Sequence, residues 1–223
     1  MRFLLFELVT GEEPRFGRVG TQIPYVGQHR RAPASLPSGG RLVFTHDLPT
    51  SNTAPSVVYL SRDPRSVLLS EYRWQQRRRF APGPFETFAR EFVEGKTNPW
   101  GSWDGHVSRW LADDGASGRR RLVVRFEDLR ADAVGELRRI ADFLGLDASD
   151  DAIERAVSHN DLARMREKED TGSILADSRT DLRFVGSGEV AGWRERLDPA
   201  LADEIATAFA GNLARFGYEG ANR

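Results

Sequence analysis

A short apolar run that changes abruptly into a helical pattern is the feature that most constrains the fold of this chain. Residues 56–61 are rich in β-branched and aromatic side chains, as in a buried strand. The run ends at Arg62-Asp63-Pro64, where Asp63 can cap a helix and proline suits the first helical position. Apolar residues then recur at helical spacing through residue 79. This pattern predicts a strand that leads directly into a helix.

A strand that ends in arginine at a helix N-terminus predicts an anion site. The exposed N–H groups of the first turn, the helix dipole and the guanidinium of Arg62 all favour a phosphate there. Ser70, two helical turns further on, would add a hydroxyl to the same anion. The alternative is an ordinary strand–helix junction with a surface arginine.

Strands and helices alternate along the chain. Two more strands are predicted at residues 41–45 and 121–126. The alternation favours an α/β fold with a parallel sheet, in one domain that covers residues 1–223. Residues 10–40 and 169–192 are predicted to form a surface connection and a mobile, glycine-rich loop. The predicted helices cover residues 2–9, 64–79, 84–94, 103–113, 133–144, 149–159, 161–168 and 199–216.

The carboxyl ends of the predicted strands carry the candidate site residues. Ligands of open parallel sheets bind beyond these strand ends. His46, Arg62 and Phe126-Glu127 each lie at the end of a predicted strand. We therefore expect these side chains to converge on one cleft.

Composition excludes several classes of function. The chain has no cysteine, which rules out disulfides, thiolate metal sites and a cysteine nucleophile. No two histidines have the spacing of a metal site, so no metal is expected. The net charge of −1 indicates neither nucleic acid nor membrane as a partner, and the apolar run at residues 3–9 is too short to span a bilayer. A cytoplasmic enzyme is the resulting expectation, and no pattern indicates its oligomeric state.

Several segments resemble the sulfotransferase family that uses 3′-phosphoadenosine-5′-phosphosulfate (PAPS). The segment with Arg62 and Ser70 is similar to the 3′-phosphate-binding segment of that family. The likeness runs from about residue 41 to residue 218, in the order of the family's motifs. The other matching segments are Thr45-His46-Asp47-Leu48-Pro49, Gly101-Ser102-Trp103 with His106 and Trp110, Arg125-Phe126-Glu127-Asp128-Leu129, Ala191-Gly192-Trp193-Arg194 and Phe216-Gly217-Tyr218.

The resemblance implies a fold and a reaction. The fold would be three-layer α/β/α with a central parallel sheet, as in P-loop nucleotide-binding proteins. The reaction would move a sulfuryl group from PAPS to a hydroxyl or amine of a small-molecule acceptor. His46 matches the family's catalytic histidine, and a neutral imidazole can take the acceptor's proton. Arg62 and Ser70 would bind the 3′-phosphate, and Phe126 stands where the family often has a tyrosine against adenine.

The chain also departs from the family pattern. Phe44 replaces a lysine, and Gly186-Ser187-Gly188 replaces a phosphate-gripping Arg-Lys-Gly, for which Arg183 would substitute. The family's glycine-rich phosphosulfate loop does not occur, whereas residues 2–9 resemble the helix that follows this loop. We therefore expect an N-terminally truncated form of the fold. These departures leave open a second function, that of an inactive relative that binds a nucleotide or a protein partner.

Overall fold

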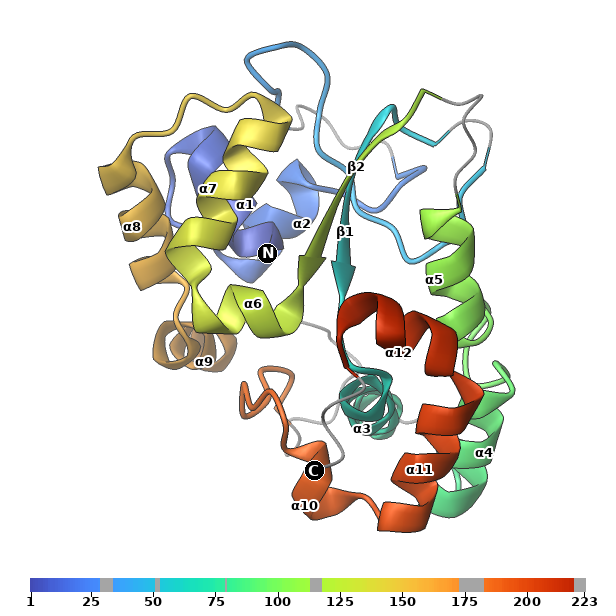
Figure 1. Cartoon of the computed structure of the whole chain (residues 1–223). Helices are drawn as coiled ribbons and strands as arrows, with labels where there is room; N and C mark the ends of the chain where they lie inside the picture. The colour runs from blue at the N-terminus through green and yellow to red at the C-terminus, as the bar shows by residue number, and fades with distance from the viewer. Residues whose placement is uncertain (29–33, 51–52, 79, 113–117, 173–182, 219–223) are drawn as a thin grey trace. The chain divides into compact units, whose positions relative to one another are not determined.

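The chain forms two compact units in a computed structural model (Figure 1). The expectation of one domain stays a prediction. The structure describes residues 1–28, 34–50, 53–78, 80–112, 118–172 and 183–218. The first unit contains Met1–His46, Asp128–Asp177 and Arg183–Gly188, and the second contains Asp47–Glu127, Ser178–Leu182 and Glu189–Arg223.

Two parallel strands form the sheet of the second unit in the part of the chain that the structure describes. Strand β1 covers Ser56–Ser61 and strand β2 covers Arg120–Arg125. Their register places Ser56 opposite Arg120 and Ser61 opposite Arg125. Both strands and their parallel direction were expected from the sequence, and the α/β class is confirmed.

The predicted strand at residues 41–45 is wrong. This segment forms only isolated bridges, between Arg41 and Ser35 and between Phe44 and Tyr25. The bridge at Phe44 does not extend into a ladder, because Gly27 turns the partner segment away with a φ of 80°. His46 follows this bridge and not a strand.

Five helices of the first unit have well-defined ends. Aspartate or serine side chains accept hydrogen bonds from the first-turn N–H groups of three of them, at Asp132, Ser149 and Asp161. Gly145 ends one helix in the left-handed region, directly after the predicted helix 133–144. These helices are α1 (Arg2–Thr10), α2 (Phe16–Gln22), α7 (Ala133–Leu144), α8 (Asp150–His159) and α9 (Leu162–Thr171).

Helix α2 lies within residues 10–40, which were expected to be only a connection. Packing stabilises this short helix despite its weak sequence pattern. The Phe16 ring lies edge-on to the rings of Phe3 and Phe184, at 4.7 and 5.9 Å between ring centres. Val19, one turn later, is 1% exposed.

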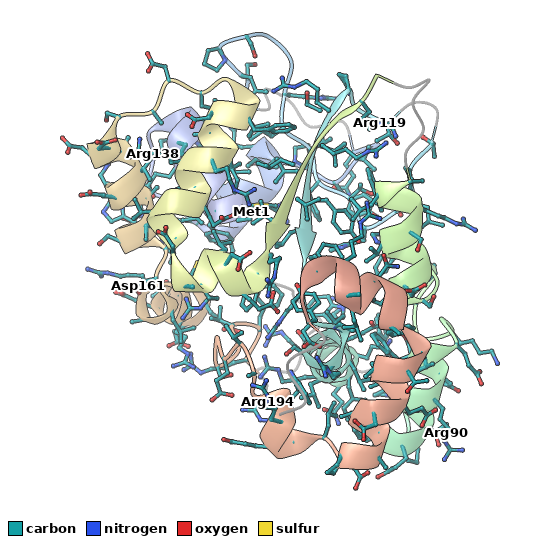
Figure 2. All side chains as sticks on the ribbon, in the orientation of Figure 1. Met1, Arg90, Arg119, Arg138, Asp161 and Arg194 are labelled. Carbon is teal, nitrogen blue, oxygen red and sulfur yellow. The ribbon has the colours of Figure 1, made fainter. Side chains whose placement is uncertain are left out.

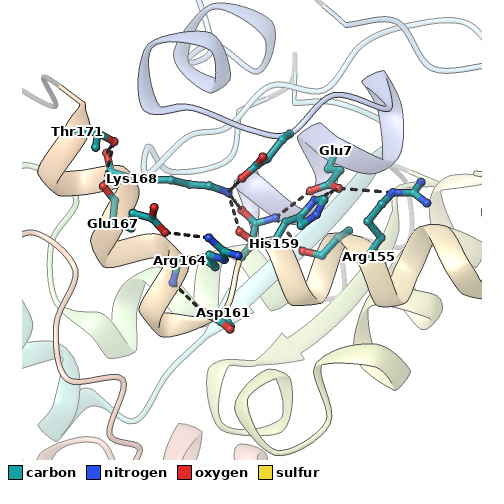
Figure 3. A network of polar contacts seen from close by, with 11 residues as sticks. Glu7, Arg155, His159, Asp161, Arg164, Glu167, Lys168 and Thr171 are labelled. Atoms are coloured by element: carbon teal, nitrogen blue, oxygen red, sulfur yellow. Dashed lines mark hydrogen bonds and ion pairs between the residues drawn. The ribbon is translucent and has the colours of Figure 1, made fainter.

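A polar network ties α1 to α8 and α9 (Figure 3). The Glu7 carboxylate, 3% exposed, contacts His159 Nδ1 at 2.7 Å and accepts a hydrogen bond from Asn160 at 3.2 Å. The ammonium of Lys168 donates to the carbonyl oxygen of His159 and to the side chain of Asn160. Glu7 is thus a buried charge with several partners, as burial requires.

Helices around a shared apolar core make up the rest of the second unit. The helix that follows β1 is α3 (Pro64–Arg77), and α6 (Phe126–Ala131) crosses from this unit into the first. The other helices are α4 (Phe85–Val93), α5 (Trp103–Leu111), α10 (Trp193–Arg196), α11 (Pro199–Ala208) and α12 (Ala210–Phe216). The core contains Leu68, Phe88, Ala89, Phe92, Val107, Leu111, Trp193, Leu197, Ala202, Ile205, Phe209, Leu213, Phe216 and Tyr218.

Two predicted segments differ from the structure near the C-terminus. The expected helix at 199–216 is broken at Phe209, which separates α11 from α12. The expected loop at 169–192 is helical up to Thr171, and residues 183–192 contain neither helix nor strand. Residues 173–182 lie outside the described residues. None of the described helices is long and apolar enough to cross a membrane.

Candidate active site

The junction between β1 and α3 has the predicted geometry. The Asp63 carboxylate accepts a hydrogen bond from Arg65 N at 2.9 Å and so caps α3, and Pro64 occupies the first helical turn. The cap residue lies two residues after the end of the strand, and the helix begins at the next residue, Pro64. Arg62 therefore lies between the end of a strand and the N-terminus of a helix, where an anion is favoured.

Arg62 and Phe126 lie together, although 64 positions separate them along the chain. They directly follow Ser61 and Arg125, which are paired in the sheet. The Arg62 guanidinium carbon lies 4.3 Å from the centre of the Phe126 ring. The strand pairing thus brings a cation and an aromatic ring, both predicted as site residues, to one place.

The Arg62 guanidinium uses one of its donors within the second unit, and another has no acceptor among the described residues. Its Nη2 donates to the carbonyl oxygen of Glu189 at 3.1 Å. Its Nε is buried and has no hydrogen-bond partner among the described residues. Burial lowers the pKa of Arg62, whereas the charges of Glu127 and Asp63 oppose this shift. A phosphate oxygen would satisfy a donor that is now buried without an acceptor.

Ser70 is exposed on α3, one helical turn beyond Ser66. The Ser66 hydroxyl donates to the carbonyl oxygen of Val190 at 3.1 Å. Residues 189 and 190 therefore contact both Arg62 and α3. The prediction that Ser70 and Arg62 bind one anion stays a prediction.

Arg183 belongs to the first unit and makes a two-point ion pair with Asp170, at 3.1 and 3.3 Å. Both side chains are about half exposed. The pair lines an open depression of about 580 Å³. The other lining residues are Ala163, Arg166, Glu167 and Thr171.

Two more arginines lie beside Gly186-Ser187-Gly188, the segment that stands where the resembled family has Arg-Lys-Gly. Arg166 Nη2 donates to the carbonyl oxygen of Gly186 at 3.2 Å. A Cβ atom at Gly188 would lie 3.4 Å from Arg130 Nη2. No sequence pattern pointed to Arg130 or Arg166, because they come from α6 and α9, far from this segment in the chain.

His46 is exposed and packs against two aromatic rings of the first unit. Its ring centre lies 6.0 Å from that of Phe44 and 6.5 Å from that of Tyr25. Its backbone N–H donates to the Tyr25 hydroxyl at 3.4 Å. His46 lies at the end of the first unit, and Arg62 and Phe126 belong to the second. The convergence of His46 with them stays a prediction.

Asp47, the residue that follows His46, accepts hydrogen bonds from two tryptophans. The indole N–H of Trp100 donates to the Asp47 carboxylate, and that of Trp110 donates to the Asp47 carbonyl oxygen, each at 3.1 Å. Trp110 lies in the segment with Gly101-Ser102-Trp103 that was singled out in the sequence, but its contact with Asp47 was not foreseen. These bonds restrict the backbone next to the candidate base.

His106, quoted above in a segment that resembles the family, makes a specific polar contact. Its Nδ1 lies 2.9 Å from the Tyr59 hydroxyl of β1. Trp110 lies 6.2 Å from the Tyr59 ring and 6.3 Å from the His106 ring, between ring centres. Among the described residues, no three His, Cys, Asp or Glu side chains are grouped to hold a metal ion.

Two parallel strands, each followed by a helix, with Arg62 and Phe126 directly after the strand ends, define an α/β protein. The model of the sulfotransferase domain family matches residues 27–217. The chain therefore belongs to the sulfotransferase family, the PAPS-dependent family that its motifs resemble.

Curated relatives are similar over most of this chain. Sulfotransferase 2A6 of Rattus norvegicus is 27% identical over 190 residues, which cover 80% of this chain and 66% of the relative. Sulfotransferase 1E1 of Rattus norvegicus is 28% identical over 155 residues, which cover 67% of this chain and 52% of the relative. The chain thus spans between about half and two thirds of the length of these relatives.

Solved structures with a similar fold were determined with PAP bound. Retinol dehydratase in complex with androsterone and the inactive cofactor PAP is 27% identical, with a TM-score of 0.64 over 81% of this chain and 55% of that one. Retinol dehydratase with retinol and PAP is 25% identical, with a TM-score of 0.66 over the same shares. Mouse sulfotransferase SULT7A1 complexed with PAP, at 20% identity and a TM-score of 0.64, agrees in fold.

Proposed function

We propose that this chain transfers a sulfuryl group from PAPS to a hydroxyl or amine of a small-molecule acceptor. The observation that carries the proposal is the Arg62–Phe126 pair at the ends of two paired strands, in a chain of the sulfotransferase family. Retinol dehydratase, a similar structure, was solved with PAP together with androsterone or retinol. We therefore propose a small hydroxylated acceptor, and we propose the cytoplasm as the site of action.

Arg62 is proposed to bind the 3′-phosphate, with Ser70 as a second donor. The buried Nε of Arg62 offers an unused donor, and the first turn of α3 adds a helix N-terminus. Phe126 is proposed to contact adenine, since an aromatic ring stacks on a base. Arg183 is proposed as a further cation for the nucleotide, as the family resemblance implies.

His46 is proposed as the general base. Its exposed imidazole can accept the proton of the acceptor hydroxyl, and the anchored Asp47 restricts its backbone. PAPS, when bound, supplies the sulfuryl group and leaves as 3′,5′-adenosine bisphosphate (PAP).

Calorimetric titration with PAP tests the nucleotide site. We expect the wild type to bind and Arg62→Ala to bind between about tenfold and a hundredfold more weakly, since a hydrogen bond to a charged group is lost. Arg90→Ala removes the same charge from an exposed position on α4 (Figure 2) and should bind like the wild type. Equal affinity of the two variants would contradict the proposal.

Turnover with a panel of small alcohols and phenols tests the base. His46→Ala should lower the rate by about 10²–10⁴-fold and leave PAP affinity unchanged. An unchanged rate would exclude His46 as the base.

The second candidate function is an inactive relative that binds a nucleotide or a partner. The observation that favours it is that Gly186-Ser187-Gly188 stands where the family has Arg-Lys-Gly, so that the arginine and the lysine are both absent from this segment. Binding of PAP by the wild type without turnover of any acceptor would support this second function over the first.

A further inference from the structure

The last described residue of the chain contacts the strand–helix junction of the second unit. Tyr218 is 3% exposed, and its hydroxyl donates to Glu127 Oε2 at 2.8 Å. Its carbonyl oxygen accepts a hydrogen bond from Arg65 Nη2 at 3.0 Å. The guanidinium carbon of Arg125 lies 4.7 Å from the centre of its ring. Tyr218 is therefore fixed through its ring, its hydroxyl and its backbone.

Glu127 joins Tyr218 to the backbone beside Arg62. Its second oxygen, Oε1, accepts a hydrogen bond from the backbone N–H of Asp63 at 3.0 Å. That N–H belongs to the peptide group between Arg62 and Asp63. The carbonyl oxygen of the same peptide group accepts a hydrogen bond from the Trp103 indole at 3.1 Å. The peptide group that follows Arg62 is thus held on both sides.

A peptide group held on both sides fixes the backbone dihedrals on either side of it. These dihedrals set the position of the Arg62 side chain relative to the N–H groups at the start of α3. A phosphate at this site would use both the Arg62 guanidinium and the N–H groups of α3. If these donors are already held in place, less conformational entropy is lost when the ligand binds.

We propose that Glu127 and Tyr218 are positioning residues for Arg62: they hold the peptide group after Arg62 so that its guanidinium and the N-terminus of α3 meet one phosphate. This inference rests on the proposed nucleotide site. It assigns to the C-terminal segment a role in ligand affinity. Glu127 acts through its two hydrogen bonds and not through its charge, because a negative charge close to Arg62 by itself disfavours an anion.

Titration of the 223-residue chain with PAP, well below the melting temperature of each variant, tests this inference. Tyr218→Phe removes one hydrogen bond to Glu127, and Glu127→Ala removes both contacts. Each is expected to weaken PAP affinity about tenfold, the scale of re-ordering a binding side chain. Glu127→Gln keeps an acceptor for Asp63 N–H and a partner for Tyr218, and should bind at least as tightly as the wild type. Since Tyr218→Phe deletes a single oxygen, it tests the inference even if Glu127→Ala does not fold.

Tyr72→Phe is the matched control, because it removes a tyrosine hydroxyl that donates to the Gly83 carbonyl oxygen at 2.8 Å. It should bind PAP like the wild type. The inference would be overturned if the PAP affinity of Tyr218→Phe were within twofold of the wild type. It would also be overturned if Glu127→Gln bound PAP as weakly as Glu127→Ala. If Arg62→Ala loses affinity and Tyr218→Phe does not, the inference fails and the nucleotide site stands. A wild type that does not bind PAP overturns both.

Discussion

The Arg65 guanidinium holds the Asp63 carboxylate at two points inside the second unit. Arg65 Nε lies 2.9 Å from Asp63 Oδ1, and Arg65 Nη2 lies 2.7 Å from Asp63 Oδ2. Arg65 is 1% exposed and Asp63 is 4% exposed. The guanidinium carbon also lies 3.9 Å from the centre of the Trp193 ring. One carboxylate therefore caps α3 and neutralises a buried cation next to Arg62.

Asp63→Ala should destabilise the protein strongly. It leaves the Arg65 charge buried without its partner, which costs about 3–5 kcal/mol of unfolding free energy. Chemical denaturation measures this loss. Asp170→Ala breaks the half-exposed pair with Arg183 and should cost about 1 kcal/mol or less. Similar losses for the two variants would contradict the assignment of a buried, structurally important pair.

Phe126→Ala should weaken PAP binding by about 1–3 kcal/mol, since a base that stacks on an aromatic ring loses this contact. Phe126→Tyr keeps the ring and should retain the affinity. Phe80→Ala removes a ring that is 61% exposed and is the control. Calorimetric titration measures the PAP affinity of all three variants. If Phe126→Ala bound PAP as tightly as the wild type, the Phe126 ring would not contact the nucleotide.

Gly95→Ala should be far more costly than Gly83→Ala. Both glycines have a positive φ, of 75° and 78°, which costs an L-residue about 1–2 kcal/mol. A Cβ atom at Gly95 would also lie 2.3 Å from the backbone nitrogen of Ser102, the residue that caps α5. Gly83 has nothing within 4 Å of such an atom.

The clash at Gly95 involves backbone on both sides, so it adds about 1–3 kcal/mol to the strain that the two variants share. Thermal and chemical denaturation measure the difference in unfolding free energy. Equal destabilisation would mean that the segment around Ser102 moves freely.

Tyr59→Phe should reduce the loss of stability at alkaline pH. Burial raises the pKa of Tyr59 well above its ordinary value of about 10. Below that ordinary value, the folded and the unfolded chain both keep the proton. Above it, the unfolded chain loses the proton first, so the free energy of unfolding falls by up to about 1.4 kcal/mol per pH unit.

Denaturation at several alkaline pH values measures this slope. The slope should be shallower for Tyr59→Phe, and also for Tyr218→Phe, because burial and the charge of Glu127 raise the pKa of Tyr218 too. A slope unchanged in both variants would contradict the assignment.

Local patterns predicted the junction at Arg62 well, because its determinants are local. The apolar run of β1, the Asp63 cap and Pro64 act within a few residues, and Gly145 ends α7 for the same kind of reason. Helix α2 depends on rings from Phe3 and Phe184, so its own residues indicated only a connection. Residues 41–45 have the composition of a strand, but among the described residues their pairing is limited to isolated bridges at Arg41 and Phe44.

The supporting contacts of the candidate site were not predictable from local patterns. Glu127 contacts residues 64 positions before it and 91 positions after it. Arg130 and Arg166 likewise reach a glycine-rich segment from distant helices. Only the tertiary fold brings such residues together. The family resemblance covers motifs such as the one around Phe126-Glu127, but it does not say which partner each oxygen of Glu127 takes.

The parallel pairing of β1 with β2 also sets when the site can exist during folding. Bringing Ser61 and Arg125 together costs conformational entropy, and this cost comes before the contacts between the two strands can offset it. Until the two strands pair, Arg62 and Phe126 belong to separate parts of an unfolded chain. A ligand held by both residues recognises only chains that have completed this step. Such a ligand would therefore stabilise the folded protein by mass action. Only molecules in which β1 and β2 have paired would bind it.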